Sequence, residues 1–285
     1  MTLVNNLKDR FQNGNIVAKL IYINCAVFLV TLLTKVFQGL YVNEYHFIIE
    51  WFSLEANTSS LLGKPWSIIS YGFLHADFIH ILMNLIVLYY IGNLFLEYFT
   101  QKQLLSFYLL GTFFGGLLFV FSQNFFPLFN GKTSILVGAS AGISAIFIAI
   151  SAYIPNYQIK LRFIGYVKLS YLAAFWIGLD VLGLVGTNAG GHFAHLGGAL
   201  FGFLYVKQDN NKEIRILDFV SLLFKKRKKP LKTVHKSKRK TKKNTAKNTD
   251  LTQKQIDSIL DKISKSGYDT LTKSEKEFLF KQGKK

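Results

Sequence analysis

Residues 78–96 read FIHILMNLIVLYYIGNLFL, and this stretch decides the class of the protein. A helix needs about 20 mostly apolar residues to cross the roughly 30 Å of hydrocarbon in a bilayer, and this run is close to that length. It also carries His80 and Asn84, which are four residues apart and therefore share one helix face. Polar groups inside a membrane are costly, so by default they mark functional positions. The stretch therefore predicts a membrane helix that carries part of a functional site.

Five further stretches are similarly apolar, and they lie near residues 16–37, 104–122, 135–154, 167–185 and 191–206. Lipid offers the backbone no hydrogen-bond partner, so each is expected to be helical. The alternation of a membrane barrel is missing from the sequence. The fold class is therefore an all-α membrane protein, a bundle of six transmembrane helices. Residues 38–70 mix aromatic side chains with Glu44, Glu50 and Glu55, so we expect a first external loop that lies in the membrane interface.

Charge is distributed very unevenly along the 285 residues. Residues 207–285 contain 24 Lys and Arg against 9 Asp and Glu, which is +15 of the net +18. The first 206 residues have too few charges to solvate the surface of an ordinary soluble enzyme. The single cysteine, Cys25, excludes a disulfide scaffold and a cysteine-based zinc site.

The composition divides the chain into three predicted domains. Residues 1–206 form the membrane domain, residues 207–249 a basic disordered cytoplasmic linker, and residues 250–285 a small cytoplasmic helical hairpin that turns at Gly267. The run of basic residues at 225–229 predicts contact with anionic lipids, and no nucleic acid is expected as a partner.

Lys and Arg also predict the orientation. They precede the first span, lie in the loops between spans two and three and between spans four and five, and follow span six. Positive charge favours the cytoplasmic side, so both termini are expected to be cytoplasmic. We therefore predict an integral membrane protein with this orientation.

Small residues surround the polar groups of the later spans. Ser140 lies within GASAG at residues 138–142, and His192 and His195 lie within GHFAHLGG at residues 191–198. Gly138 with Gly142, and Gly198 with Gly202, have the spacing that lets helices approach closely. A serine and a histidine on two such helices can form a nucleophile and its base, and His80 and Asn84 can donate hydrogen bonds to an oxyanion.

Each of these residues also has a simpler interpretation. A serine flanked by glycines is usually a packing residue, an intramembrane histidine can serve an ion or proton pathway, and an asparagine can join two helices. A channel that uses the histidines as a relay is therefore an alternative. Asp180 is the only acidic residue deep in a span, so the spans offer no carboxylate pair for acid–base chemistry, and there is no H-E-x-x-H zinc motif.

Three motifs in order resemble those of the rhomboid family of intramembrane serine proteases, over about residues 16–206. The family's H-x-x-x-N matches residues 80–84, following Leu74-His75. Its G-x-S matches Gly138-Ala139-Ser140, and its A-H-x-G-G matches Ala194-His195-Leu196-Gly197-Gly198. The hairpin around residues 256–280 is similar to a C-terminal segment of some bacterial rhomboids. The resemblance therefore implies an integral protein of a bacterial inner (plasma) membrane.

The resemblance implies an intramembrane serine endopeptidase that cleaves transmembrane protein substrates near their external end, at a small residue. Ser140 would be the nucleophile and His195 the general base and acid, with no third acidic member. The Ser140 backbone N–H, His80 and Asn84 would hold the oxyanion, and Gly138, Gly142, Gly197, Gly198 and Gly202 would allow close packing. No metal and no organic cofactor is implied. The alternative within the family is an inactive rhomboid-like protein that binds or escorts membrane helices.

The sequence departs from the family pattern at three positions. The family's Trp-Arg of the first external loop is Trp66-Ser67 here, and the glycine after the serine is Ala141. The aromatic residue that many members carry four positions after the serine is Ser144. These departures concern how the loop is anchored and what packs beneath the histidine.

Overall fold

The computed structural model describes residues 5, 11–41, 47–162, 164–207 and 246–282. The chain divides into two compact units, Met1–Lys226 and Arg227–Lys285, and each is considered by itself. Most of the predicted linker, with the basic run at 225–229, lies outside the described residues.

Each of the six apolar stretches contains one long helix: α2 (Ile16–Tyr41), α6 (Phe78–Tyr98), α7 (Gln101–Phe125), α8 (Ser140–Tyr153), α9 (Leu169–Gly183) and α10 (Ala189–Lys207). Three of them, α2, α6 and α7, are long and apolar enough to cross a membrane. The apolar helices α8 and α9 are shorter, at 14 and 15 residues. At 1.5 Å per residue, each spans about 21–23 Å, less than the hydrocarbon core.

The fourth stretch differs from its prediction, because its helix begins at Ser140 and not near residue 135. Ile135 and Leu136 form β2, which pairs antiparallel with β1 (Leu54–Glu55). The Gly138 N–H then donates to the Tyr71 carbonyl at 3.0 Å, and Gly138 has φ +133°, which side-chain-bearing residues rarely adopt. The strand pairing at residues 135–136 and the positive φ of Gly138 keep this segment out of the helix, which begins at Ser140.

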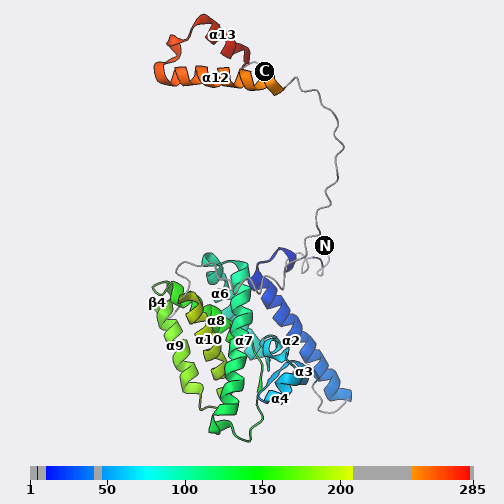
Figure 1. Ribbon diagram of the computed structural model, residues 1–285. Coiled ribbons are helices and arrows are strands. Elements are labelled where there is room, and N and C mark those ends of the chain that lie inside the picture. The colour runs from blue at the N-terminus through cyan, green and yellow to red at the C-terminus, as the bar shows by residue number, and fades with distance from the viewer. Residues whose placement is uncertain (1–4, 6–10, 42–46, 163, 208–245, 283–285) are drawn as a thin grey trace. The chain divides into compact units, whose positions relative to one another are not determined.

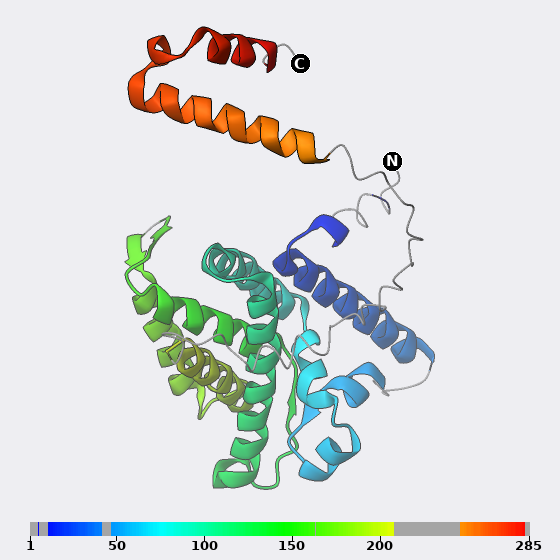
Figure 2. The same cartoon turned by 45° about the horizontal axis from the view of Figure 1, so that its top comes forward.

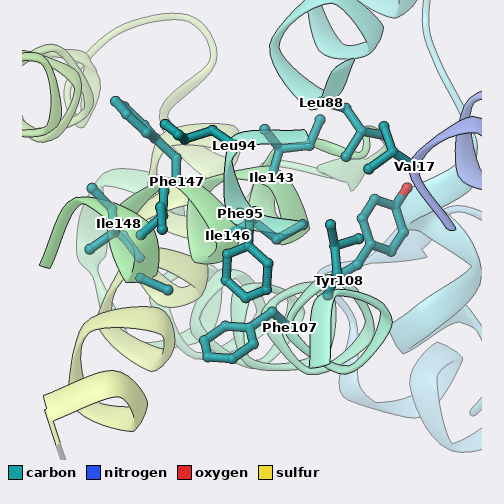
Figure 3. Close-up of a cluster of buried hydrophobic side chains, with 14 of the residues drawn as sticks. Val17, Leu88, Leu94, Phe95, Phe107, Tyr108, Ile143, Ile146, Phe147 and Ile148 are labelled. Carbon is teal, nitrogen blue, oxygen red and sulfur yellow. The ribbon is translucent and has the colours of Figure 1, made fainter. Parts of the chain in front are cut away.

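The helices are arranged with α2 and α9 at opposite edges, and α7, α8 and α10 lie between them (Figures 1 and 2). The largest apolar core forms where α2, α6, α7 and α8 meet, and its labelled side chains include Val17, Leu88, Phe107 and Ile146 (Figure 3). Burying such a side chain contributes about 1.5–3 kcal/mol. This core holds α8 in place at the centre.

Residues 47–73 form short elements: α3 (Phe47–Phe52), β1, α4 (Thr58–Gly63), α5 (Ser67–Ser70) and the 3₁₀ helix η1 (Tyr71–Phe73). Lys64 links α3 to β1, because its Nζ donates to the Glu50 carbonyl at 2.8 Å and to Glu55 Oε1 at 2.7 Å. The Trp66 ring stacks on Trp51 with 6.2 Å between centroids. Lys64 thus anchors a segment that has Ser67 where the family pattern has an arginine.

Two connections complete the first unit. Between α7 and α8 lies the 3₁₀ helix η2 (Pro127–Phe129), followed by β2. Between α8 and α9 lies an antiparallel hairpin of β3 (Gln158–Leu161) and β4 (Gly165–Lys168), in which Gln158 pairs with Lys168. The hairpin ends where α9 begins, so the fifth helix starts at Leu169 rather than near residue 167.

The C-terminal unit contains α12 (Ala246–Ser266), η3 (Tyr268–Thr270) and α13 (Lys273–Gln282). Gly267, with φ +82°, ends α12, as expected for a residue without a side chain at a helix end. Thr272 and Glu275 cap the start of α13: the Thr272 N–H donates to the Glu275 carboxylate at 2.8 Å, and the Glu275 N–H donates to Thr272 Oγ1 at 3.4 Å.

Candidate active site

Ser140 is the first residue of α8, and it is half-buried. The first N–H groups of a helix have no partner within it, so the backbone N–H groups at this end of α8 are available to an anion. The extended segment before Ser140 is fixed through Gly138 to Tyr71, whose hydroxyl donates to the Thr112 carbonyl of α7 at 2.7 Å. The serine therefore sits on a rigid helix start.

His195 of α10 faces this serine, with 2.6 Å between its Nε2 and Ser140 Oγ. The contact requires α8 and α10 to approach closely, and two glycines permit this. A Cβ added at Gly198 would overlap the Ala141 carbonyl oxygen, and one at Gly202 would overlap that of Ala145. Gly197 packs against Gly115 of α7, and Gly142 packs against Tyr108 and Thr112 of α7. The structure thus brings the predicted serine and histidine together.

Asp180 completes a chain of hydrogen bonds that the resemblance did not imply. It lies on α9, and only 3% of its surface is exposed. Its Oδ1 is 2.7 Å from His195 Nδ1 and 2.9 Å from His192 Nδ1, whereas its Oδ2 has no hydrogen-bond partner among the described residues. The signal that could have found it was present in the sequence, because Asp180 is the one acidic residue deep in a predicted span.

His80 of α6 lies close to the serine and to Gly138. A Cβ built on Gly138 would lie 2.9 Å from His80 Nε2 and 3.5 Å from Ser140 Oγ, so the lack of a side chain at Gly138 lets the His80 ring lie beside the serine. The Ala76 N–H donates to His80 Nδ1, with 3.5 Å between the two nitrogens. Nδ1 is thus the acceptor, so Nε2 carries the hydrogen and can act as the donor. Asn84 Nδ2 donates to the His80 carbonyl at 2.9 Å and has a second N–H. His80 Nε2–H can therefore donate toward the serine, and Asn84 lies one turn further along the same face of α6.

His75, just before α6, is buried next to His80, with 5.1 Å between the ring centroids. Burial, aided by the neighbouring His80, lowers its pKa to about 4. Together with Val137 it lines a cavity of about 220 Å³ bounded by α2 and α3. At neutral pH His75 thus adds no positive charge to the site.

An aromatic ring packs near His195 although Ser144 replaces the usual aromatic residue of α8. Trp176 of α9 lies 6.4 Å from His195 between ring centroids, and its Nε1–H donates to Ser144 Oγ at 3.1 Å. The small side chain of Ser144 leaves room for the tryptophan. A residue from a different helix thus supports the base, and sequence spacing could not have identified it.

Within the described part of the chain, one group of potential metal ligands lies close together, namely Asp180, His192 and His195. One ligand atom from each lies within 4.8 Å of the others. However, His195 Nε2 is directed to Ser140, and its Nδ1 is directed to Asp180. An ion bound here would compete with these hydrogen bonds and remove the base from the serine. We therefore assign this cluster to hydrogen bonding.

Comparison with known proteins bears on the same region. The family model described as Rhomboid domain matches residues 62–208, and one described as a family of unknown function (DUF6576) matches residues 241–285. The chain is 31% identical to presenilin-associated rhomboid-like protein A, mitochondrial, of Danio rerio over 137 residues, which are 47% of this chain and 35% of that protein.

Two further relatives give a similar result. RHOMBOID-like protein 12, mitochondrial, of Arabidopsis thaliana is 28% identical over 148 residues, 48% of this chain and 44% of that protein. Presenilin-associated rhomboid-like protein, mitochondrial, of Bos taurus is 28% identical over 138 residues, 47% of this chain and 35% of that protein. The matched region thus spans less than half the length of each relative.

These relatives contradict the predicted location. The sequence predicted a bacterial inner membrane with cytoplasmic termini, whereas all three relatives are named as mitochondrial proteins. The prediction is wrong for a physical reason: the distribution of Lys and Arg distinguishes the two sides of a membrane but does not identify the membrane.

Proposed function

The chain belongs to the rhomboid family, and from that premise we propose that it is an intramembrane serine endopeptidase. The observation that carries the proposal is the 2.6 Å contact between Ser140 Oγ and His195 Nε2. A serine hydroxyl is a weak nucleophile until a base takes its proton, and this contact is within the reach that proton transfer requires. An inactive rhomboid-like protein would have no need of this pair.

The reaction follows from the two side chains. Ser140 Oγ bonds to the scissile carbonyl carbon while its proton passes to His195 Nε2 and the carbonyl π electrons move to oxygen. The tetrahedral species then re-forms the C=O bond and breaks the C–N bond, and the leaving amine takes the proton from His195. Water attacks the resulting ester, His195 accepts the water's proton, and Ser140 regains a proton as it leaves.

The oxyanion formed in this reaction would be held by three donors: the Ser140 backbone N–H, His80 Nε2–H and the second N–H of Asn84. The first benefits from its position at the positive end of α8. The oxygen would lie between the His80 ring and Ser140, which come close to each other beside Gly138. Preorganised donors of this kind supply a large part of the catalysis in acyl transfer.

We propose that all six long helices cross the membrane. Although α8 spans only about 21 Å as a helix, eleven of its fourteen residues are buried, so protein rather than lipid surrounds it. The extended segment before Ser140 is tolerated at membrane depth for the same reason. The substrates would be transmembrane helices, cut near the membrane face at which α6, α8 and α10 begin.

The decisive experiment uses the purified full chain in liposomes with a test transmembrane substrate and a fluorophosphonate probe. The probe should label Ser140, and both labelling and cleavage should fall by on the order of 10⁶ in Ser140→Ala and in His195→Ala. Ser144→Ala is the matched control, because Ser144 lies one turn further along α8 and bonds Trp176. Cleavage that persists in Ser140→Ala would exclude the serine mechanism.

We also propose that the C-terminal part is accessory, with its basic run at 225–229 contacting anionic headgroups. Deletion of everything after Lys225 should leave cleavage largely intact in neutral lipid and should remove any stimulation by anionic lipid. Loss of cleavage by a folded, truncated protein would make the tail part of the enzyme.

A further inference from the structure

We propose that Asp180 is a positioning residue that holds His195 in the tautomer and orientation needed to take the proton of Ser140. The inference rests on the proposed function and extends it from a pair of residues to a chain of three. The hydrogen bonds that carry it are Asp180 Oδ1 to His195 Nδ1 at 2.7 Å and His195 Nε2 to Ser140 Oγ at 2.6 Å.

The first step concerns the tautomer of His195. A neutral imidazole has one nitrogen that donates and one that accepts. The carboxylate of Asp180 can only accept, so His195 Nδ1 must carry the hydrogen and donate it to Oδ1. Nε2 is then the acceptor, which is the state that can receive a proton from Ser140 Oγ. The opposite tautomer would place two lone pairs against each other at Asp180.

The second step concerns charge. When His195 takes the proton it becomes an imidazolium, and the nearest negative charge is the buried carboxylate of Asp180, bonded to it at 2.7 Å. Charges attract more strongly in such a protected site than in water. Burying a carboxylate costs free energy. Its position beside the base therefore indicates that it stabilises the charged state of His195.

The third step concerns α9, the helix that carries Asp180. α9 is largely exposed on its outer side, and only Leu169 and Asp180 are buried in it. A helix that faces mostly lipid thus directs its single carboxylate inward to the histidines. If packing alone were required, an apolar residue would fill this position without the desolvation cost.

His192 holds the carboxylate from the other side. Its Nδ1 donates to the same Oδ1 at 2.9 Å, and its ring occupies the space that a side chain at Gly183 would fill. This second donor fixes the rotamer of Asp180, while His192 has no contact with Ser140 among the hydrogen bonds of the described residues. We therefore expect His192 to matter less than Asp180.

The competing explanation is that Asp180 merely joins α9 to α10. The two explanations differ in what they predict for the chemistry of a folded protein. A joining residue affects the amount of folded enzyme, whereas a positioning residue affects kcat with little change in KM and sets the tautomer of His195.

The test compares Asp180→Asn with the control His192→Gln in the full chain, in liposomes, with rates normalised to folded protein. Asp180→Asn should lower kcat by about 10⁴-fold, the size found when a triad aspartate becomes an amide, with KM within about twofold. His192→Gln should stay within about tenfold of the unsubstituted protein. Asp180→Asn that retains kcat within threefold would overturn the inference.

A second measurement needs no Asp180 variant and covers the case in which that variant does not fold. In the unsubstituted chain with ¹⁵N-labelled histidine, the His195 resonances are those lost in His195→Ala. At neutral pH they should show a protonated Nδ1 and an unprotonated Nε2, and a protonated Nε2 would overturn the inference. Failure of the proposed function is distinct, because then the fluorophosphonate would not label Ser140 even in the unsubstituted chain.

Discussion

The two helices that flank His195 differ sharply in how they are held. On one side, α8 has eleven of its fourteen residues buried and packs through Ala141 and Ala145 against the glycines of α10. On the other side, α9 has two of its fifteen residues buried, Leu169 and Asp180. The nucleophile therefore lies on the rigid side of the site and the carboxylate on the weakly constrained side.

The difference in burial between α8 and α9 matches two different requirements of the proposed chemistry. Bond formation needs Ser140 placed to within a fraction of an ångström, and a fully packed helix supplies this precision. Support of the base is provided by α9 through a few directional contacts, those of Asp180 and Trp176 with α10 and α8. Substitutions on the two sides should therefore have different consequences.

Apart from the variants of Ser140, His195 and Asp180, the largest effect is expected at the oxyanion, where α6 supplies Asn84. Asn84→Ala should lower kcat by about 10²–10³, because it removes one donor to the developing charge. It should leave the protein folded, since among the described residues the amide makes one hydrogen bond, to its own helix at the His80 carbonyl. Cleavage kinetics together with a thermal melt measure this, and an unfolded Asn84→Ala protein would indicate a structural role instead.

The second effect tests the packing of α8 against α10. In Gly198→Ala the new methyl group would overlap the Ala141 carbonyl oxygen, so the helices must separate. Overpacking of this kind costs about 1–3 kcal/mol of stability, and a 1 Å displacement of the reacting groups costs about 10² in rate. Unchanged cleavage and an unchanged melting temperature would show that the close approach is not needed.

The third effect compares two glycines of the weakly constrained helix. In Gly183→Ala the methyl group would overlap the His192 ring, whereas a methyl group at Gly178 has nothing within 4 Å. Both substitutions favour helix by up to about 1 kcal/mol. Gly178→Ala should therefore leave cleavage unchanged, and Gly183→Ala should lower it several-fold. Equal rates for the two variants would mean that His192 does not help to hold Asp180.

The smallest effect concerns Trp176. Trp176→Phe keeps an aromatic ring near His195 but loses the 3.1 Å hydrogen bond to Ser144 Oγ. We expect a loss of about 1 kcal/mol in stability and a change in kcat of no more than about threefold. A double-mutant cycle with Ser144→Ala isolates this bond, and a coupling energy near zero would contradict its contribution.

The sequence predicted much of the fold because the relevant properties are local. Runs of apolar residues indicated the six long helices, and the glycines at 198 and 202 indicated which faces could approach. The start of α8 was missed, because an apolar run does not distinguish a helix from a paired strand. In the structure β1 holds residues 135–136 as a strand, and Gly138 with its positive φ precedes the helix.

For the site, the sequence by itself determined the candidates Ser140, His195, His80 and Asn84, because each belongs to a motif of fixed spacing within an apolar stretch. Only the tertiary structure decided that Asp180 and Trp176 complete it. The physical reason is that both lie on α9, and the side chains that face one another across two helices depend on the rotation and crossing of those helices. These are set by packing over the whole bundle, and no spacing within one segment encodes them.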